Sequence, residues 1–236
     1  MKRLALLLIA TLLLLLCVSC NQDKVTKEQY YGMYSHLSQV WAQSLLHTDA
    51  KVAFYGDSRV IGADWNAAYP DSKVVNLGVG GDRISNLLTR MPQIRNLTEN
   101  GQLECVFLAI GGNDCMSGSY DSTVFRTEYD RLLAELEELG LTVYVNTVAG
   151  ITDEGSAVSS KTAKTVNGRM KEANTIIKEL AQSHSMTVID MAMAELMNTE
   201  DGKLKSAYAS PDGVHFSAAG NQLWFDTLRP YVQLYD

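Results

Sequence analysis

Four short motifs of this chain carry side chains that together could perform acyl transfer. A serine hydroxyl can attack an acyl carbon, and a histidine held by a carboxylate can take the serine proton. Glycine turns and a side-chain amide offer neutral N–H donors to the oxyanion that then forms. The motifs follow one another as Gly56-Asp57-Ser58, Asn76–Asp82, Gly111–Asp114 and Asp212–His215.

Ser58 follows a predicted strand at Val52–Tyr55 and precedes residues that can start a helix. A serine at such a turn exposes its hydroxyl, and its backbone N–H at the helix N-terminus can bind an oxyanion. We expect Asp57 to brace the turn by hydrogen bonds. Taken alone, this motif is also compatible with a serine that only caps a helix.

The glycines of Gly78–Asp82 end a second predicted strand and allow positive φ and close approach of a ligand. A phosphate-binding loop is the rival interpretation. The pattern Gly-x-Gly-x-x-Gly fails, because Arg83 stands at the third glycine position. Asn113 follows a third strand, and its amide suits a developing oxyanion, although Gly-Gly-Asn-Asp is also an ordinary turn sequence.

Among the four histidines, His215 alone has a carboxylate three residues before it, that of Asp212. In a turn, this spacing lets Asp212 accept the Nδ1–H while Nε2 faces a serine. We interpret His36, His47 and His184 as ordinary surface or core residues. Metal-binding motifs such as His-Glu-x-x-His are absent from the sequence, so no metal or other cofactor is expected.

Short apolar runs alternate with amphipathic stretches along the chain. The runs predict five buried strands, at Val52–Tyr55, Val74–Leu77, Cys105–Ile110, Leu141–Val145 and Met186–Ile189. The stretches predict helices at Arg83–Arg95, Ser122–Leu139, Thr162–Ser183 and Ser217–Leu234. This alternation indicates an α/β fold with a parallel sheet, in which ligands lie beyond the carboxyl ends of the strands. The motifs should therefore meet at one edge.

The first residues resemble a secretory signal peptide. Met1-Lys2-Arg3 precedes an apolar run, Leu4–Val18, and small residues precede Cys20 as in a bacterial lipobox, although Cys17 stands where leucine is usual. We expect cleavage after residue 19 and lipid on Cys20. The alternatives are a plain signal peptide and an uncleaved membrane anchor. The apolar run is short for the membrane-spanning helix that an anchor would need.

The charge of the chain argues against nucleic acid as a partner. The net charge is −7, and loss of Lys2 and Arg3 with residues 1–19 would make it −9. Cys105 and Cys115 are expected to be free thiols, because extended chain between them would hold their Cα atoms too far apart for a disulfide.

Together the four motifs resemble the SGNH/GDSL hydrolase family, in its order and spacing, from Val52 to Leu228. Asn76–Asp82 is similar to the second motif of one branch of the family. That branch includes platelet-activating-factor acetylhydrolase subunits and bacterial lysophospholipase/thioesterases. The resemblance implies a three-layer α/β/α, flavodoxin-like fold with five parallel strands in order 2-1-3-4-5. Residues 20–50 would then be a tether and N-terminal helix, and residues 51–236 the hydrolase domain.

The resemblance also implies roles for residues. Ser58 would be the nucleophile and Asp212 and His215 would complete the triad. The N–H groups of Ser58 and Gly81 and the amide of Asn113 would form the oxyanion hole.

Two arginines depart from the family pattern. Arg59 stands where leucine is common, and Arg83 where threonine is common. We expect ion pairs with Asp57 or Asp82. Contact with an acidic or polyhydroxylated substrate is the alternative.

The expected activity is hydrolysis of carboxylic esters through a serine acyl-enzyme. An open site without a long apolar insertion favours short acyl groups, with acetyl esters on carbohydrate first. Lysophospholipase or thioesterase activity is the alternative within the family. A non-catalytic carbohydrate-binding lipoprotein and acyl transfer to a sugar are two others. The protein would be exported and lipid-anchored in a bacterial cell envelope.

Overall fold

The computed structural model describes residues 38, 41–191, 196 and 201–236. These residues belong to one unit, His36–Asp236. The predicted signal peptide, Cys20 and most of the predicted tether and N-terminal helix lie outside the described residues, and residues 41–46 are helical. Within the described part, none of the helices combines the length and apolar character that crossing a bilayer requires.

The centre of the described fold is a sheet of five parallel strands in the order β2-β1-β3-β4-β5, as predicted. The strands are β1 (Val52–Gly56), β2 (Val74–Gly78), β3 (Cys105–Ala109), β4 (Thr142–Asn146) and β5 (Thr187–Ile189). Gly56 at the end of β1 pairs with Gly78 on one side and with Ala109 on the other. The loops after β2 and β3 therefore flank the loop after β1.

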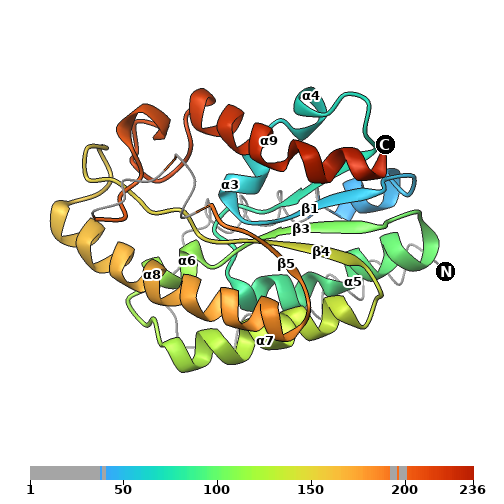
Figure 1. The fold of residues 1–236 in the computed structure, drawn as a ribbon, viewed down its shortest axis with the longest axis horizontal. Coiled ribbons are helices and arrows are strands. Elements are labelled where there is room, and N and C mark those ends of the chain that lie inside the picture. The colour runs from blue at the N-terminus through green and yellow to red at the C-terminus, as the bar shows by residue number, and fades with distance from the viewer. Residues whose placement is uncertain (1–37, 39–40, 192–195, 197–200) are drawn as a thin grey trace. The chain divides into compact units, whose positions relative to one another are not determined.

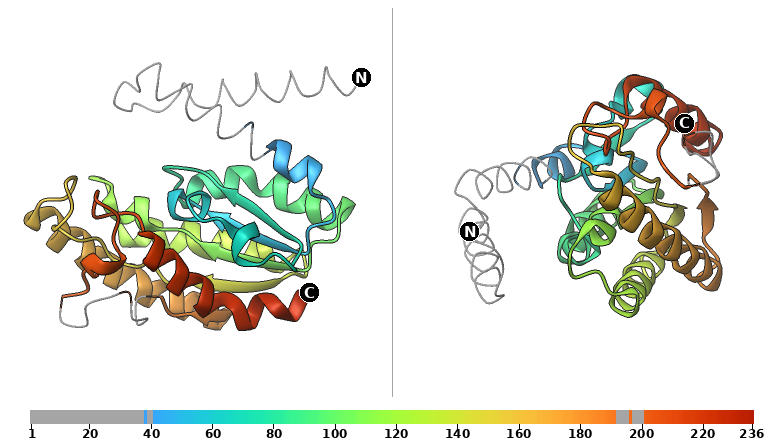
Figure 2. Two further views of the ribbon diagram at one scale, coloured as in Figure 1. Left: turned by 90° about the horizontal axis from the view of Figure 1, so that it is seen from above. Right: turned by 90° about the vertical axis from the view of Figure 1, so that its left-hand side faces the viewer.

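Helices cover both faces of the sheet (Figures 1 and 2). The helices of one face are α5 (Ile84–Asn100), α7 (Ser122–Glu137) and α8 (Ser160–Ser183), and the other face carries α4 (Trp65–Ala68) and α9 (Ala218–Val232). Alternation along β1 explains the two layers: Ala53 and Tyr55 pack in the first cluster, and Val52 and Phe54 in the second. This confirms the three-layer α/β/α architecture.

Two short helices, α3 (Ser58–Ile61) and α6 (Gly112–Met116), follow β1 and β3 directly. The sequence analysis did not predict α6, which contains Cys115. Sequence periodicity cannot reveal helices of four or five residues, and α4 was missed for the same reason. Ser217 caps α9, its hydroxyl accepting the Gly220 N–H at 3.2 Å.

The thiols of Cys105 and Cys115 are free and buried, as expected. They lie in different core clusters, one on each face of the sheet. Two short 3-10 helices complete the described elements, η1 (Ser206–Tyr208) before α9 and η2 (Gln233–Tyr235) at the end of the chain.

Candidate active site

Ser58 is the first residue of α3, at a tight turn after β1. Asp57 caps this helix: its Oδ1 accepts the backbone N–H of Arg59 at 3.0 Å, the bracing role expected for it. A side chain at Gly56 could not be accommodated, since its Cβ would lie 2.1 Å from the carbonyl oxygen of Ala109. The turn thus fixes the half-exposed Ser58 at the carboxyl end of the central strands.

Ser58, His215 and Asp212 form a continuous hydrogen-bonded chain. The Ser58 Oγ lies 2.8 Å from Nε2 of His215, and the His215 Nδ1 lies 2.6 Å from Oδ2 of Asp212. When Nδ1 carries the proton and donates to Asp212, Nε2 can accept the proton of the serine hydroxyl. The structure thus brings together the three side chains that the sequence indicated for a triad.

The carboxylate of Asp212 is held in place by its own loop. Its Oδ1 accepts the backbone N–H of Val214 at 2.8 Å and of His215 at 3.0 Å, and the Ser210 hydroxyl donates to it at 2.6 Å. Desolvation raises the pKa of Asp212, but the bonds from His215, Ser210 and the backbone outweigh it and hold the pKa well below its ordinary value. Asp212 is therefore a carboxylate at neutral pH. Sequence reasoning missed Ser210.

The predicted oxyanion donors lie in the loops that flank Ser58. Gly81 has a left-handed φ of 80°, which explains the glycine, and Asn113 is the second residue of α6. The Asn113 amide donates to the carbonyl oxygen of Asp82 at 2.9 Å, which fixes its orientation. Because an amide nitrogen carries two hydrogens, Asn113 can donate to a ligand while it keeps this bond.

A buried ion pair supports the glycine loop. The Asp82 Oδ2 accepts from Nε of Arg90 at 2.8 Å and lies 2.7 Å from its second terminal nitrogen. The same guanidinium donates to the carbonyl oxygens of Leu77 on β2 and Gly56 on β1. Arg90 thus joins the ends of two strands to the loop. Burial raises the pKa of Asp82 to about 6, and Arg90 opposes that rise.

The prediction that Arg59 and Arg83 form ion pairs with Asp57 or Asp82 is wrong. Within the described residues, Asp82 pairs with Arg90, and no ion pair joins Arg59 to Asp57. Arg83 instead acts electrostatically on Asp114, whose pKa burial raises to about 6.

The Arg59 guanidinium is bound to backbone carbonyl oxygens. They belong to Ala149 at 2.6 Å, Gly150 at 2.8 Å, and Val214 at 2.8 and 3.1 Å. These bonds join Arg59 to the loop after β4 and to the loop that carries His215.

The loop that carries His215 packs closely on the loop after β4. The backbone N–H of Thr152 donates to the carbonyl oxygen of Gly213 at 2.8 Å. The backbone N–H of Ser156 donates to the carbonyl oxygen of Pro211, also at 2.8 Å. A Cβ on Gly155 would lie 2.2 Å from the Gly213 nitrogen, so the two backbones touch at glycine. The position of His215 thus depends on a second loop.

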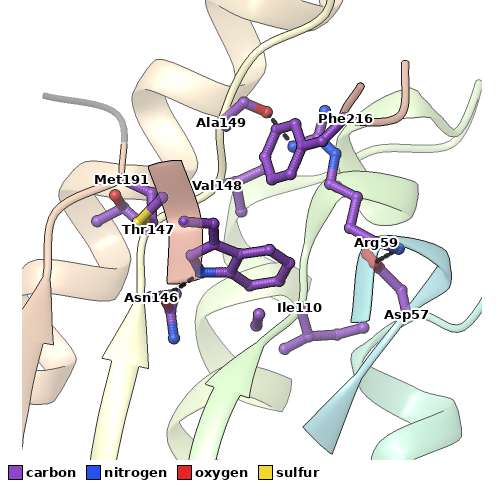
Figure 3. A pocket seen from close by; sticks show the side chains of 12 residues that line it. Asp57, Arg59, Ile110, Asn146, Thr147, Val148, Ala149, Met191 and Phe216 are labelled. Carbon is purple, nitrogen blue, oxygen red and sulfur yellow. Dashed lines mark hydrogen bonds between the residues drawn. The ribbon is translucent and has the colours of Figure 1, made fainter. Parts of the chain in front are cut away.

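A small cavity of about 30 Å³ lies among Asp57, Arg59, Phe216 and Trp224 (Figure 3). A water molecule needs about 10–15 Å³ by this kind of measure, so the cavity has room for one or two waters and none for a fatty acyl chain. Burial raises the pKa of the Asp57 carboxyl above its ordinary value, against the opposing charge of Arg59.

No three histidine, cysteine, aspartate or glutamate side chains gather as metal ligands in the part of the chain that the structure describes.

The family model of GDSL-like lipases and acylhydrolases matches residues 42–223. The chain belongs to the GDSL-like lipase/acylhydrolase family. It is accordingly a carboxylic ester hydrolase of the GDSL type. A comparison with curated proteins finds no match.

Solved structures of similar fold include a GDSL-like lipase from Bacteroides thetaiotaomicron, with a TM-score of 0.68 and 16% identity over 86% of this chain and 98% of that one. The acetyl xylan esterase AlAXEase has a TM-score of 0.61 and 22% identity over 77% and 98%. A variant of an acetyl xylan esterase from Geobacillus stearothermophilus has a TM-score of 0.58 and 18% identity over 78% and 96%. At these identities the likeness shows the fold.

Proposed function

We propose that the protein hydrolyses short-chain carboxylic esters through an acyl-enzyme on Ser58. The observation that carries the proposal is the hydrogen-bonded chain from Ser58 Oγ through His215 to Asp212. In such a chain the imidazole takes the serine proton, and the carboxylate fixes its tautomer and stabilises the imidazolium. Membership of an acylhydrolase family supports ester chemistry at this serine.

Acylation follows from the proposed roles. Ser58 Oγ bonds to the acyl carbon, its proton passes to Nε2 of His215, and the carbonyl electron pair moves onto oxygen. The N–H groups of Ser58 and Gly81 and the amide of Asn113 donate to that oxyanion. When the carbonyl re-forms, the alkoxide leaves and takes the proton from His215.

Deacylation repeats these steps with water as the nucleophile. Water loses a proton to His215 Nε2 and attacks the acyl carbon of the ester on Ser58. The tetrahedral intermediate then collapses, the proton returns to Ser58 Oγ, and the carboxylic acid leaves. The two half-reactions consume one ester and one water and leave Ser58 and His215 in their starting protonation states.

Acetyl esters on carbohydrate are the proposed substrates. The cavity beside Asp57 is too small for a fatty acyl chain. The open hollow of about 320 Å³ between α5 and α7 is lined mainly by polar side chains such as Thr89 and Arg131. Two proteins of similar fold are acetyl xylan esterases. The second motif supports lysophospholipase or thioesterase activity as the alternative.

The test is the initial rate on p-nitrophenyl esters from acetate to octanoate, with wild type beside Ser58→Ala. We expect the highest rate on acetate, a fall by butyrate, and a loss of about 10³-fold or more in the variant. A rate that rises toward octanoate would favour the lipase or thioesterase alternative. An absence of turnover on every ester would favour a non-catalytic binding role, and product analysis with a sugar acceptor would reveal acyl transfer.

We further propose export and lipid anchoring at Cys20, supported by the sequence of residues 1–20 alone. Bacteria that express wild type or Cys20→Ala and are fed a labelled fatty acid provide the test. Label should appear on the wild-type protein only; an unlabelled wild-type protein would favour a plain signal peptide.

A further inference from the structure

The side chain of Arg59 reaches both residues that flank His215. Nε and a terminal nitrogen donate to the carbonyl oxygen of Val214 at 3.1 and 2.8 Å. The guanidinium carbon lies 4.8 Å from the ring centroid of Phe216, and the two side chains face each other (Figure 3). Because Arg59 directly follows Ser58 in the chain, one side chain links the immediate neighbours of Ser58 and His215.

The same guanidinium also binds the loop after β4. Its terminal nitrogens donate to the carbonyl oxygens of Ala149 at 2.6 Å and Gly150 at 2.8 Å. Three segments therefore meet at Arg59: its own helix α3, the loop after β4 and the loop that carries His215. The latter two are also joined by backbone hydrogen bonds and by the contact of Gly155 with Gly213.

Carbonyl oxygens, an aromatic ring and the charges of two carboxylates surround the Arg59 guanidinium. None of the ion pairs of the described residues includes Arg59, but the charges of Asp57 and Asp212 oppose the lowering of its pKa by burial. A charged side chain in a buried setting is tolerated when its donors are used, and the rigid guanidinium fork can serve several acceptors at fixed angles. Donors committed in this way fix geometry and leave little for a substrate.

We propose that Arg59 is a positioning residue that holds His215 at hydrogen-bonding distance from Ser58. This inference rests on the proposed function, because it concerns the same proton transfer. A residue that acts through His215 affects every ester alike, whereas a residue that binds substrate affects the esters whose groups it touches. The two roles are therefore separable by kinetics.

The test measures kcat and KM of wild type, Arg59→Leu and Arg59→Lys on p-nitrophenyl acetate and on the anionic ester 4-acetoxybenzoate. We expect Arg59→Leu to lower kcat by about 10- to 100-fold on both esters, because a displacement of about 1 Å can cost that much. KM should change by less than about 2-fold, as expected for an interaction made only in the transition state. Lysine should recover part of the loss, since its ammonium keeps the charge and can donate to carbonyl oxygens but lacks the rigid fork of the guanidinium.

A second readout is independent of turnover. The low-field proton NMR signal of the His215 Nδ1–H that Asp212 accepts should weaken in Arg59→Leu. Arg229→Leu is the matched control, because Arg229 also binds a carbonyl oxygen, that of Ala68, and lies over an aromatic ring, that of Tyr69. Its kcat and NMR signal should match wild type, and thermal unfolding of each variant checks that the fold is retained.

Two results would overturn the proposal. One is a wild-type kcat and NMR signal in Arg59→Leu and Arg59→Lys. The other is a rise in KM confined to the anionic ester, which would assign Arg59 to substrate binding. A Ser58→Ala protein with full esterase activity would instead overturn the proposed function, and the NMR signal would still report on Arg59.

Discussion

The side chains of the proposed site are held in place by hydrogen bonds from their neighbours. Asp212 orients His215, and Ser210 and two backbone N–H groups orient Asp212. Asn113 is likewise oriented by the carbonyl oxygen of Asp82. Each reactive group thus has its rotamer fixed before a substrate binds, which is what electrostatic preorganisation requires.

Replacement of Asp212 by asparagine should lower kcat by about 10⁴-fold, because the amide stabilises the wrong imidazole tautomer. The measurement is kcat on p-nitrophenyl acetate. Ser210→Ala is the control: it removes one bond to Asp212 and should cost about 10-fold or less. A kcat of Asp212→Asn within 10-fold of wild type would contradict the proposed role of this carboxylate.

Asn113→Ala should lower kcat by about 10²–10³-fold and leave KM nearly unchanged, because the oxyanion exists only in the transition state and intermediate. Steady-state kinetics on p-nitrophenyl acetate provide both constants. If KM rises while kcat stays at its wild-type value, Asn113 binds the substrate and is not an oxyanion donor.

At the scale of elements, the position of the site depends on loops that contact each other through backbone. Because Gly56 has no Cβ, the end of β1 can lie close to the backbone of Ala109. For the same reason, the loop after β4 can contact Gly213 of the His215 loop at Gly155. These contacts join residues far apart in the sequence, so the sequence alone gave no sign of the second one. The loops after β1, β2 and β3 were predictable, because parallel strands end at one edge.

Gly155→Ala should lower both thermal stability and kcat, because the new Cβ would lie 2.2 Å from a backbone nitrogen of the His215 loop and one loop must shift. We expect a loss of about 10-fold or more in kcat. Gly168→Ala is the control: its Cβ meets nothing within 4 Å in α8, so stability should rise by about 0.5–1 kcal/mol with kcat unchanged. Equal behaviour of the two variants would contradict this account.

For the molecule as a whole, the apolar runs predicted the five strands, and the family resemblance predicted their order. The roles of Arg59 and Arg90 were not predictable, because their partners include backbone carbonyl oxygens that only the fold brings near. Arg90 did carry one signal: it lies at helical spacing from Leu87 and Ile94, on the apolar stripe of α5. A charged residue on such a stripe indicates a buried partner, here Asp82.

The contact between α7 and α8 should make stability depend on pH. His184 lies 2.6 Å from Glu137 and 2.9 Å from Asp130. Desolvation lowers the pKa of His184, but the two carboxylates outweigh it and raise the pKa above its ordinary value. Because the folded protein binds this proton more tightly than the unfolded chain, the stabilisation is present below about pH 6.5 and is lost as pH rises through the folded pKa.

His184→Gln should therefore reduce the free energy of unfolding more at pH 6 than at pH 9, by up to about 1 kcal/mol, since the carboxylates are exposed. Urea unfolding at the two pH values measures the difference, with the exposed His47→Gln as control. The same loss at both pH values would show that the proton on His184 contributes nothing.

The central claim is that ester hydrolysis proceeds through Ser58, and covalent labelling tests it most directly. The protein is treated with a fluorophosphonate, activity on p-nitrophenyl acetate is followed, and the labelled peptide is identified by mass. We predict one label per chain, on Ser58, with activity lost in proportion to labelling and no label in Ser58→Ala. Activity that survives complete labelling of Ser58, or that falls with labelling of another residue, would contradict the account.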